Sequence, residues 1–216
     1  MSTDEKIVYL ARHGESVCNT KGVVQDSEGG LTILGREQAY YLGRRFARKG
    51  IERILTSFDE RAHATAIQAS GFVGASVFGL HELHEARQPS HLVGISVTDE
   101  KVLAFKKKRE EAFSAGNVRI YDEETFCMLH GRALYVAEFL RNMSHRCVLV
   151  ISHGVFLTYL INTLQHGHNL TPEIIVRASQ MFENTGVVKA VYGQHTTFTG
   201  PATGWRLWPG DTSHLE

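Results

Sequence analysis

The chain has 216 residues, a formal net charge of zero, 43% hydrophobic residues and 21% charged residues. This balance is that of an ordinary globular protein, and it gives no reason to expect a nucleic acid or a membrane surface as a partner. The length fits a single domain, 1–216, that can bury a sizeable core. Twelve histidines are many for this length and favour a site built on imidazole chemistry.

The cysteines and the N-terminal residues bear on the compartment. An odd number of cysteines without CxxC spacing argues against a disulfide framework and for a reducing environment; they are Cys18, Cys127 and Cys147. The opening residues, MSTDEK, are polar and do not predict a secretory signal. The longest apolar stretch, Val148–Ile161, is interrupted by polar residues. We therefore expect a cytoplasmic protein.

Strand and helix patterns alternate through the first 80 residues, and apolar periodicity with turn residues sets their limits. The expected elements are a strand Lys6–Ala11, a loop Glu15–Gly30, a helix Leu31–Gly50 with Thr32 and Gly50 as its caps, a strand Arg53–Thr56, a helix capped by Asp59 that runs to about Ser70, and a strand Val77–Gly79. This order predicts a parallel sheet joined by right-handed crossovers.

The alternation stops near residue 80, and residues 80–118 are predicted to be an insertion laid over the sheet edge and the active site. The later elements are a charged helix Thr98–Ala115, a helix Tyr121–Met143 with Asp122, Glu123 and Glu124 in its first turn, a strand Arg146–Ser152, a helix Val155–Leu164, a short helix opened by Thr171-Pro172, and terminal strands Gly186–Gly193 and Gly204–Trp208. The predicted fold class is α/β: a three-layer sandwich with a mostly parallel central sheet and helices on both faces.

Two predicted strands end in His-Gly. Ile7–Ser16 reads IVYLARHGES, and Cys147–Ser152 runs directly into His153-Gly154. In open α/β sheets, ligand sites form beyond the carboxyl ends of the strands. The strand Arg53–Thr56 also ends there and leads into the helix that carries Arg61. If these strands are neighbours, two histidines and two arginines converge on one pocket.

Such a cluster favours a phosphate dianion, because guanidinium groups bind its oxygens bidentately and helix N-termini add N–H donors. A neutral imidazole in the correct tautomer can attack phosphorus and form a phosphohistidine. The other cationic groups would stabilise charge on the phosphoryl oxygens. The leaving alkoxide needs a proton, which an acidic side chain of residues 80–97 could supply.

Less specific interpretations stand beside this one. A His-Gly at a strand end can be a simple turn, and Arg61 can be a solvated helix residue. His81, His84 and His91 could bind zinc, although their spacing is irregular and no cysteine accompanies them. The basic run Lys106–Arg109 can be a solvated helix face or can attract an anionic substrate. The sequence contains no P-loop, GxGxxG or GxSxG, which removes nucleotide-loop and serine-hydrolase interpretations.

Four motifs, in order over about three-quarters of the chain, resemble those of the histidine phosphatase superfamily, the phosphoglycerate-mutase-like proteins. They are RHGES at 12–16 followed by Asn19, the segment 31–43 that is similar to LTxxGxxQAxxLG, the segment 57–66 that is similar to SxxxRAxxTA, and SHG at 152–154. The tripeptide RHG is common, but the four together are highly specific.

This resemblance implies a phosphohistidine mechanism with His13 as the nucleophile. Arg12, Arg61 and His153 would complete the phosphate pocket, and Asn19, Gly154 and Gln25 would contact the substrate. The proton donor of this superfamily is usually a glutamate in a segment like LxEixxGxxEG. Residues 80–83 match its first half, which makes Glu82 the expected donor. The second half is missing, and Glu85 is the rival.

The expected activity is hydrolysis of a small phosphorylated metabolite by a metal-independent phosphatase of this superfamily, with inorganic phosphate as product. No cofactor and no metal are expected, and the oligomeric state is left open. Two alternatives remain: phosphoryl transfer of the phosphoglycerate mutase type, and a non-catalytic module that binds phosphate or a phosphoprotein. We favour hydrolysis because the chain is shorter than typical bisphosphoglycerate-dependent mutases and its middle segment differs from theirs.

Overall fold

A six-stranded sheet forms the centre of the computed structural model, which describes residues 5–25, 29–114, 119–178, 182–197 and 200–215. The strands are β1 (Lys6–Arg12), β2 (Arg53–Thr56), β3 (Val77–Gly79), β4 (Cys147–Ser152), β5 (Val187–Thr197) and β6 (Gly200–Asp211), in the spatial order β3-β2-β4-β1-β5-β6. The first four in this order are parallel, and β5 and β6 extend the sheet antiparallel beyond β1.

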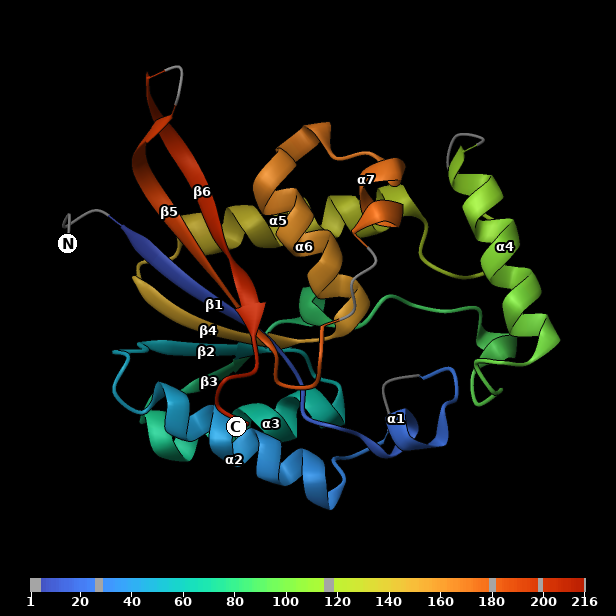
Figure 1. The fold of residues 1–216 in the computed structure, drawn as a ribbon, viewed down its shortest axis with the longest axis horizontal. Coiled ribbons are helices and arrows are strands. Elements are labelled where there is room, and N and C mark those ends of the chain that lie inside the picture. Colours follow the sequence, from blue (N-terminus) through green and yellow to red (C-terminus); the bar gives the residue numbers. More distant parts are fainter. Residues whose placement is uncertain (1–4, 26–28, 115–118, 179–181, 198–199, 216) are drawn as a thin grey trace.

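Helices cover both faces of the sheet (Figure 1). On one face lie α2 (Ile33–Phe46) and α3 (Glu60–Val73); on the other lie α5 (Phe126–Asn142), α6 (Gly154–His166) and the short α7 (Pro172–Arg177). Alternate residues of the buried strands serve the two cores. Val148 and Val150 of β4 pack with the α5–α6 side, whereas Leu149 and Ile151 pack with the α2–α3 side. The predicted three-layer α/β architecture is confirmed.

Several element boundaries differ from the sequence prediction. The helix expected over Leu31–Gly50 is shorter; Thr32 does cap it, but the chain leaves the helix at Ala47, and Gly50 lies in the following turn with φ +68°. The predicted loop 15–30 contains a short helix, α1 (Val17–Lys21). The two predicted terminal strands pair with each other in antiparallel orientation, and both are longer than predicted.

The acidic residues Asp122, Glu123 and Glu124 do not lie in the first turn of a helix, contrary to the prediction. Helix α5 begins at Phe126, capped by the Thr125 hydroxyl. The three carboxylates instead accept N–H groups of the preceding loop and of the segment after β3: Glu123 bonds Ile120 and Tyr121, Asp122 bonds Ser90, and Glu124 bonds Arg87. In this irregular segment the three carboxylates therefore accept hydrogen bonds from nearby backbone N–H groups, in place of an interaction with the dipole of α5.

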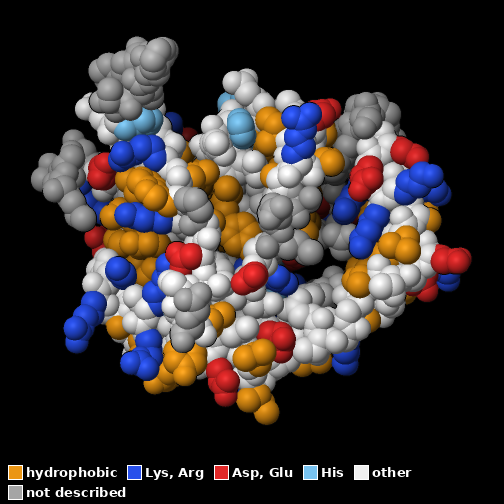
Figure 2. All heavy atoms as spheres, viewed as in Figure 1, with side chains coloured by type: hydrophobic (Ala, Val, Ile, Leu, Met, Phe, Trp, Pro, Cys, Tyr) orange, Lys and Arg blue, Asp and Glu red, His pale blue; other side chains and the backbone are white. Residues whose placement is uncertain are grey.

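The segment after β3 contains the 3-10 turns η1 (His81–Leu83) and η2 (Ser90–Leu92) and the helix α4 (Glu100–Ser114). Figure 1 shows α4 standing beyond the carboxyl ends of the strands. Figure 2 shows a hollow on this face between the α4 side and the body of the molecule. A small apolar cluster anchors α4 through Leu92, Val102 and Phe105. No helix of the described residues is long and apolar enough to cross a bilayer.

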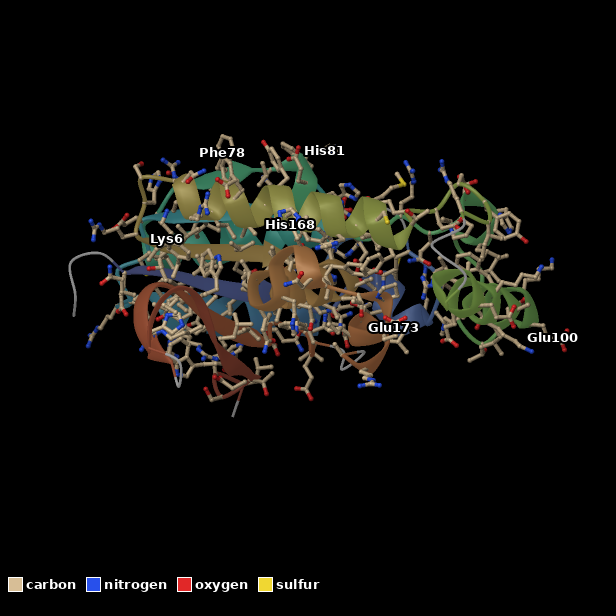
Figure 3. All side chains as sticks on the ribbon, turned by 90° about the horizontal axis from the view of Figure 1, so that it is seen from above. Lys6, Phe78, His81, Glu100, His168 and Glu173 are labelled. Atoms are coloured by element: carbon tan, nitrogen blue, oxygen red, sulfur yellow. The ribbon has the colours of Figure 1, made fainter. Side chains whose placement is uncertain are left out.

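Lys6, at the start of β1, fixes the end of α5 to the sheet. Its ammonium donates to the carbonyls of Leu140, Arg141 and Met143, where the helix leaves carbonyl oxygens without intrahelical partners (Figure 3). The side chain is only 8% exposed. Burial lowers the pKa of Lys6, while the charge of Glu52 works in the opposite direction.

We expect Lys6→Met to lower the free energy of unfolding by about 2 kcal/mol, because three carbonyls at a helix C-terminus, one of them buried, lose a charged donor. Chemical denaturation followed by circular dichroism measures this loss. Lys49→Met is the matched control, since Lys49 is exposed in the turn after α2. Equal midpoints for the two variants would contradict this role of Lys6.

Candidate active site

Pairing of β1 with β4 brings the two His-Gly turns together. The strands are parallel and in a register that sets Arg12 opposite Ser152. The backbone N–H of His13 then donates to the Ser152 carbonyl at 2.9 Å. The imidazole rings of His13 and His153 lie edge to face with centroids 5.1 Å apart. The two histidines that are 140 positions apart in the sequence therefore share one site.

His13 presents its Nε2 as a hydrogen-bond acceptor. Its Nδ1 lies 2.6 Å from the Gly14 carbonyl, which can only accept, so Nδ1 carries the proton and Nε2 carries the lone pair. The Arg61 Nε donates to this Nε2 at 3.3 Å. Burial, then the charges of His153, Arg61 and Arg12, lower the pKa of His13 well below its ordinary value. The ring, 2% exposed, is therefore a neutral imidazole at neutral pH.

His153 is held from its other side by Ser57 and Asp59. Its Nε2 lies 2.8 Å from the Ser57 hydroxyl and 2.9 Å from Asp59 Oδ2. Burial lowers the pKa of His153, and the hydrogen bond to Asp59 works in the opposite direction. For Asp59, burial works to raise the pKa, but the hydrogen bond and charge of His153 and the charge of Arg61 outweigh it and lower that pKa. The Asp59 carboxylate thus orients the ring and favours its protonated form.

Two guanidinium groups complete a buried cationic cluster. Arg61 is 1% exposed, with its Nη2 3.6 Å from Asp59 Oδ2. Arg12 donates from Nη1 to the Phe182 carbonyl at 2.6 Å. Within the described residues, Arg12 Nε and His153 Nδ1 are buried and have no protein partner. Buried polar nitrogens without partners are costly, and an anionic ligand with several oxygens is the kind of group that satisfies them.

The motifs around His13 also have a structural role. A Cβ on Gly14 would lie 2.3 Å from the Gly35 carbonyl oxygen, and one on Gly35 would lie 1.9 Å from the Glu15 carbonyl oxygen. Only glycine at both positions lets the start of α2 approach the loop that carries His13 so closely. Gln38 and Thr65 then accept the backbone N–H groups of Glu15 and Gly14. The LTxxGxxQA and RAxxTA patterns therefore fix the backbone that carries His13.

The three residues expected to contact the substrate, Asn19, Gly154 and Gln25, differ in their surroundings. The Asn19 amide oxygen closes the capping box of α1 by accepting from Ser16, and Asn184 Nδ2 lies 3.4 Å from it. Asn184 also donates to the His13 carbonyl at 3.0 Å, a link that no sequence pattern suggested. Gly154 borders Arg12, whose Nε would lie 3.6 Å from a Cβ at this glycine. Gln25 lines a cavity together with Asp59.

The two candidate proton donors are placed differently. Glu82 lies half-buried in η1, and its backbone carbonyl accepts from Arg132. The carboxylate of Glu85 lines both cavities that flank the histidines, and its charge acts on Arg12 and on His153. The Glu85 carboxylate accepts hydrogen bonds from the backbone N–H groups of Ala86, Val155 and Phe156. It therefore anchors the loop after η1 to the N-terminus of α6.

The histidines considered for zinc do not form one cluster. The rings of His81 and His84 are 5.1 Å apart, but His91 packs against Tyr121 at 4.5 Å. His81 is exposed on the outer surface, as Figure 3 shows. Across the described residues, no group of three or more histidines, cysteines or acids is placed to hold a metal ion. One residue of the basic run Lys106–Arg109 on α4, Arg109, lines a cavity next to the site.

Asp59 is the site residue that sequence reasoning assigned to another role. It does hold the N-cap position of α3, but its side chain makes no capping hydrogen bond to that helix. The reason is that its carboxylate binds the buried His153, which offers a stronger, charge-assisted partner. The sequence did contain a signal for a role in the site, because Asp59 lies two residues after Ser57 and two before Arg61, which were both placed near the predicted pocket.

We expect Asp59→Asn to lower the pKa of His153, because a negative charge that stabilises the imidazolium is removed. The histidine carbon shifts of labelled protein, followed by NMR over a pH series, measure the change as a midpoint at lower pH. Asp99→Asn is the control, since Asp99 caps the far helix α4 from an exposed loop. An unchanged His153 midpoint in Asp59→Asn would show that the carboxylate does not act on this ring.

Comparison with known proteins agrees with this geometry. The profile of the histidine phosphatase superfamily (branch 1) matches residues 8–198. Among relatives by sequence is "Probable phosphoglycerate mutase GpmB" of Erwinia tasmaniensis, 27% identical over 218 residues, which covers 97% of this chain and 94% of that protein. The counterpart from Klebsiella pneumoniae is 28% identical over 216 residues, with the same coverage.

Three solved structures with a similar fold carry a phosphatase name or a gene name. YhfR of Bacillus stearothermophilus has a TM-score of 0.74 at 23% identity, covering 97% of this chain and 99% of that one. Mycobacterial glucosyl-3-phosphoglycerate phosphatase has a TM-score of 0.73 at 18% identity, covering 94% and 97%. Phosphoserine phosphatase of Entamoeba histolytica, solved with phosphoserine, has a TM-score of 0.71 at 19% identity, covering 97% and 99%.

Members of the superfamily are phosphatases or mutases, so the expected class of protein is an enzyme of phosphoryl chemistry. The resemblance inferred from RHG, SxxxRAxxTA and SHG is confirmed by the profile match over nearly the whole chain. The protein belongs to branch 1 of the histidine phosphatase superfamily.

Proposed function

We propose that the protein hydrolyses phosphate monoesters through a phosphohistidine formed on His13. The observation that carries this proposal is the state of His13: a neutral ring whose Nδ1 is tied to Gly14 and whose Nε2 faces the Arg61 guanidinium. Arg12, Arg61 and His153 are the groups proposed to bind the phosphoryl oxygens, in line with the converging donors of the site.

The proposed reaction has two halves. In the first, the lone pair on His13 Nε2 forms the N–P bond while the P–O bond to the leaving group breaks, and the leaving oxygen takes a proton from a carboxylic acid. In the second, water attacks phosphorus, gives a proton back to that carboxylate, and the N–P bond breaks to release inorganic phosphate. Buried cations stabilise the charge that develops on the phosphoryl oxygens in both halves.

Water rather than a second phosphorylated molecule is the proposed acceptor. The cavity beside Arg12 is lined by as many acids as arginines: Arg12, Arg87 and Arg109 against Glu85, Glu110 and Glu124. A mutase has to hold a second phosphate-bearing acceptor, and this lining offers it no excess of positive charge. The relatives from Erwinia tasmaniensis and Klebsiella pneumoniae carry a mutase name, so that activity is the second candidate.

His13→Ala should abolish turnover of para-nitrophenyl phosphate, and the wild-type protein should keep its activity in EDTA. Acid-labile phosphate should be trapped on wild-type protein by rapid quenching and should be absent from His13→Ala. His168→Ala serves as the control, because His168 is an exposed histidine away from the site. Full dependence on a divalent metal would overturn the proposal, and interconversion of phosphoglycerates faster than phosphate release would establish the mutase.

Glu82 is the proposed proton donor. Both carboxylate oxygens of the rival Glu85 already accept hydrogen bonds from backbone N–H groups. Such bonds suit a residue that anchors a loop better than one that gives up and regains a proton. We expect Glu82→Gln to slow hydrolysis of an alkyl phosphate by roughly 10²–10⁴-fold, the usual weight of general acid catalysis. The loss with para-nitrophenyl phosphate should be far smaller, because that leaving group departs without protonation.

Glu85→Gln is the matched comparison for this test, and kcat is measured with both substrates for each variant. An anchoring role predicts that Glu85→Gln affects the two substrates alike and lowers the melting temperature. If the loss depends on the leaving group in Glu85→Gln and not in Glu82→Gln, Glu85 is the donor and the proposed assignment is wrong.

A further inference from the structure

A cavity of about 380 Å³ opens from the phosphate site along α6. Arg12 and Gly154 line the end next to the histidines. The rest of one wall is apolar and comes from three helices: Leu129 of α5, Val155 and Tyr159 of α6, and Ile175 and Val176 of α7. Burial raises the pKa of Tyr159, in agreement with apolar surroundings. A volume of this size accommodates a small organic molecule.

Four of the six charged side chains that line this cavity are engaged in contacts with the protein. Glu124 forms a buried ion pair with Arg132 at 2.7 Å, and the Glu85 carboxylate binds the N-terminus of α6. The Arg87 Nε donates to the Asp122 carbonyl, and the Arg109 guanidinium lies over the Phe105 ring. These bonds hold the charges in protein contacts, so the apolar wall is the surface that distinguishes the cavity.

A second cavity, of about 350 Å³, lies on the other side of Glu85 and has a different character. It is lined by Gln25, Asp59, His81, His84, Glu85 and Arg87, with Val93 as an exposed apolar member. It has two carboxylates against one arginine, which disfavours a phosphate-bearing group, and Arg12 does not line it. A phosphomonoester bound at Arg12 therefore meets the apolar cavity first.

We propose that the leaving group of the substrate is predominantly apolar, an alkyl chain or an aromatic ring system that lies against Leu129, Val155, Tyr159, Ile175 and Val176. The inference rests on the proposed phosphomonoesterase activity and specifies its substrate class. Burial of hydrocarbon along this wall contributes binding energy remote from phosphorus, and such energy raises kcat/KM. Short, highly charged phosphorylated metabolites obtain no such contribution here.

The test is kcat/KM for ethyl, butyl, hexyl and octyl phosphate, with phosphoserine and 3-phosphoglycerate for comparison. The alkyl series keeps the reacting centre nearly constant, so chain length isolates the cavity. We expect kcat/KM to rise by about fourfold for each methylene that becomes buried, and the longer alkyl phosphates to surpass both charged substrates. A flat series with measurable turnover would overturn the apolar leaving group and leave the phosphatase standing. No turnover of any of these esters would overturn the phosphatase and, with it, this inference.

Two aspartate substitutions distinguish the two cavities. Val176→Asp places a charge on the apolar wall at a position 48% exposed, so folding should tolerate it. It should reduce the ratio of kcat/KM for octyl over ethyl phosphate by at least tenfold. Val93→Asp, at a position 36% exposed in the second cavity, should leave that ratio as in the wild type. The reverse result would place the organic group in the second cavity and refute the proposal.

Discussion

The parallel pairing of β1 with β4 is the constraint on which the site depends. Each strand ends in a histidine followed by a glycine, and the register that sets Arg12 against Ser152 places the two imidazoles in contact. Because side chains alternate along a strand, a slip by one residue would turn Val8 and Leu10 out of their core and would separate the histidines. Burial of the strands on both faces therefore fixes the geometry of the chemistry.

The second feature of the site is the concentration of positive charge around His13. Arg61 and His153 are almost fully buried, and their charges act on His13 together with that of Arg12. Such a cluster disfavours protonation of His13 and attracts a dianion. Asp59 offsets part of this charge, and it does so at His153 and Arg61 rather than at His13. Burial and the neighbouring cations therefore disfavour protonation of His13, whereas Asp59 favours protonation of His153.

The sequence predicted most of the fold because hydrophobic periodicity is a local property. The limits of β2 and β3, the Thr32 cap and the short Pro172 helix all follow from patterns within a few residues. The errors arise where long-range bonds compete with local rules. Asp122, Glu123 and Glu124 resembled a helix start, yet loop N–H groups bind them. Asp59 resembled a cap, yet a histidine from the end of another strand binds its carboxylate.

The amino-acid sequence by itself determined the superfamily and the candidate site residues His13, Arg12, Arg61 and His153, because these residues sit in motifs whose order and spacing are specific. Only the tertiary structure decided how they are used. It set the tautomer of His13 through Gly14, coupled His153 to Asp59, engaged Glu85 at the start of α6 and opened an apolar cavity beside Arg12. Those features depend on contacts between residues far apart in the chain, and spacing along a sequence carries no information about such distances.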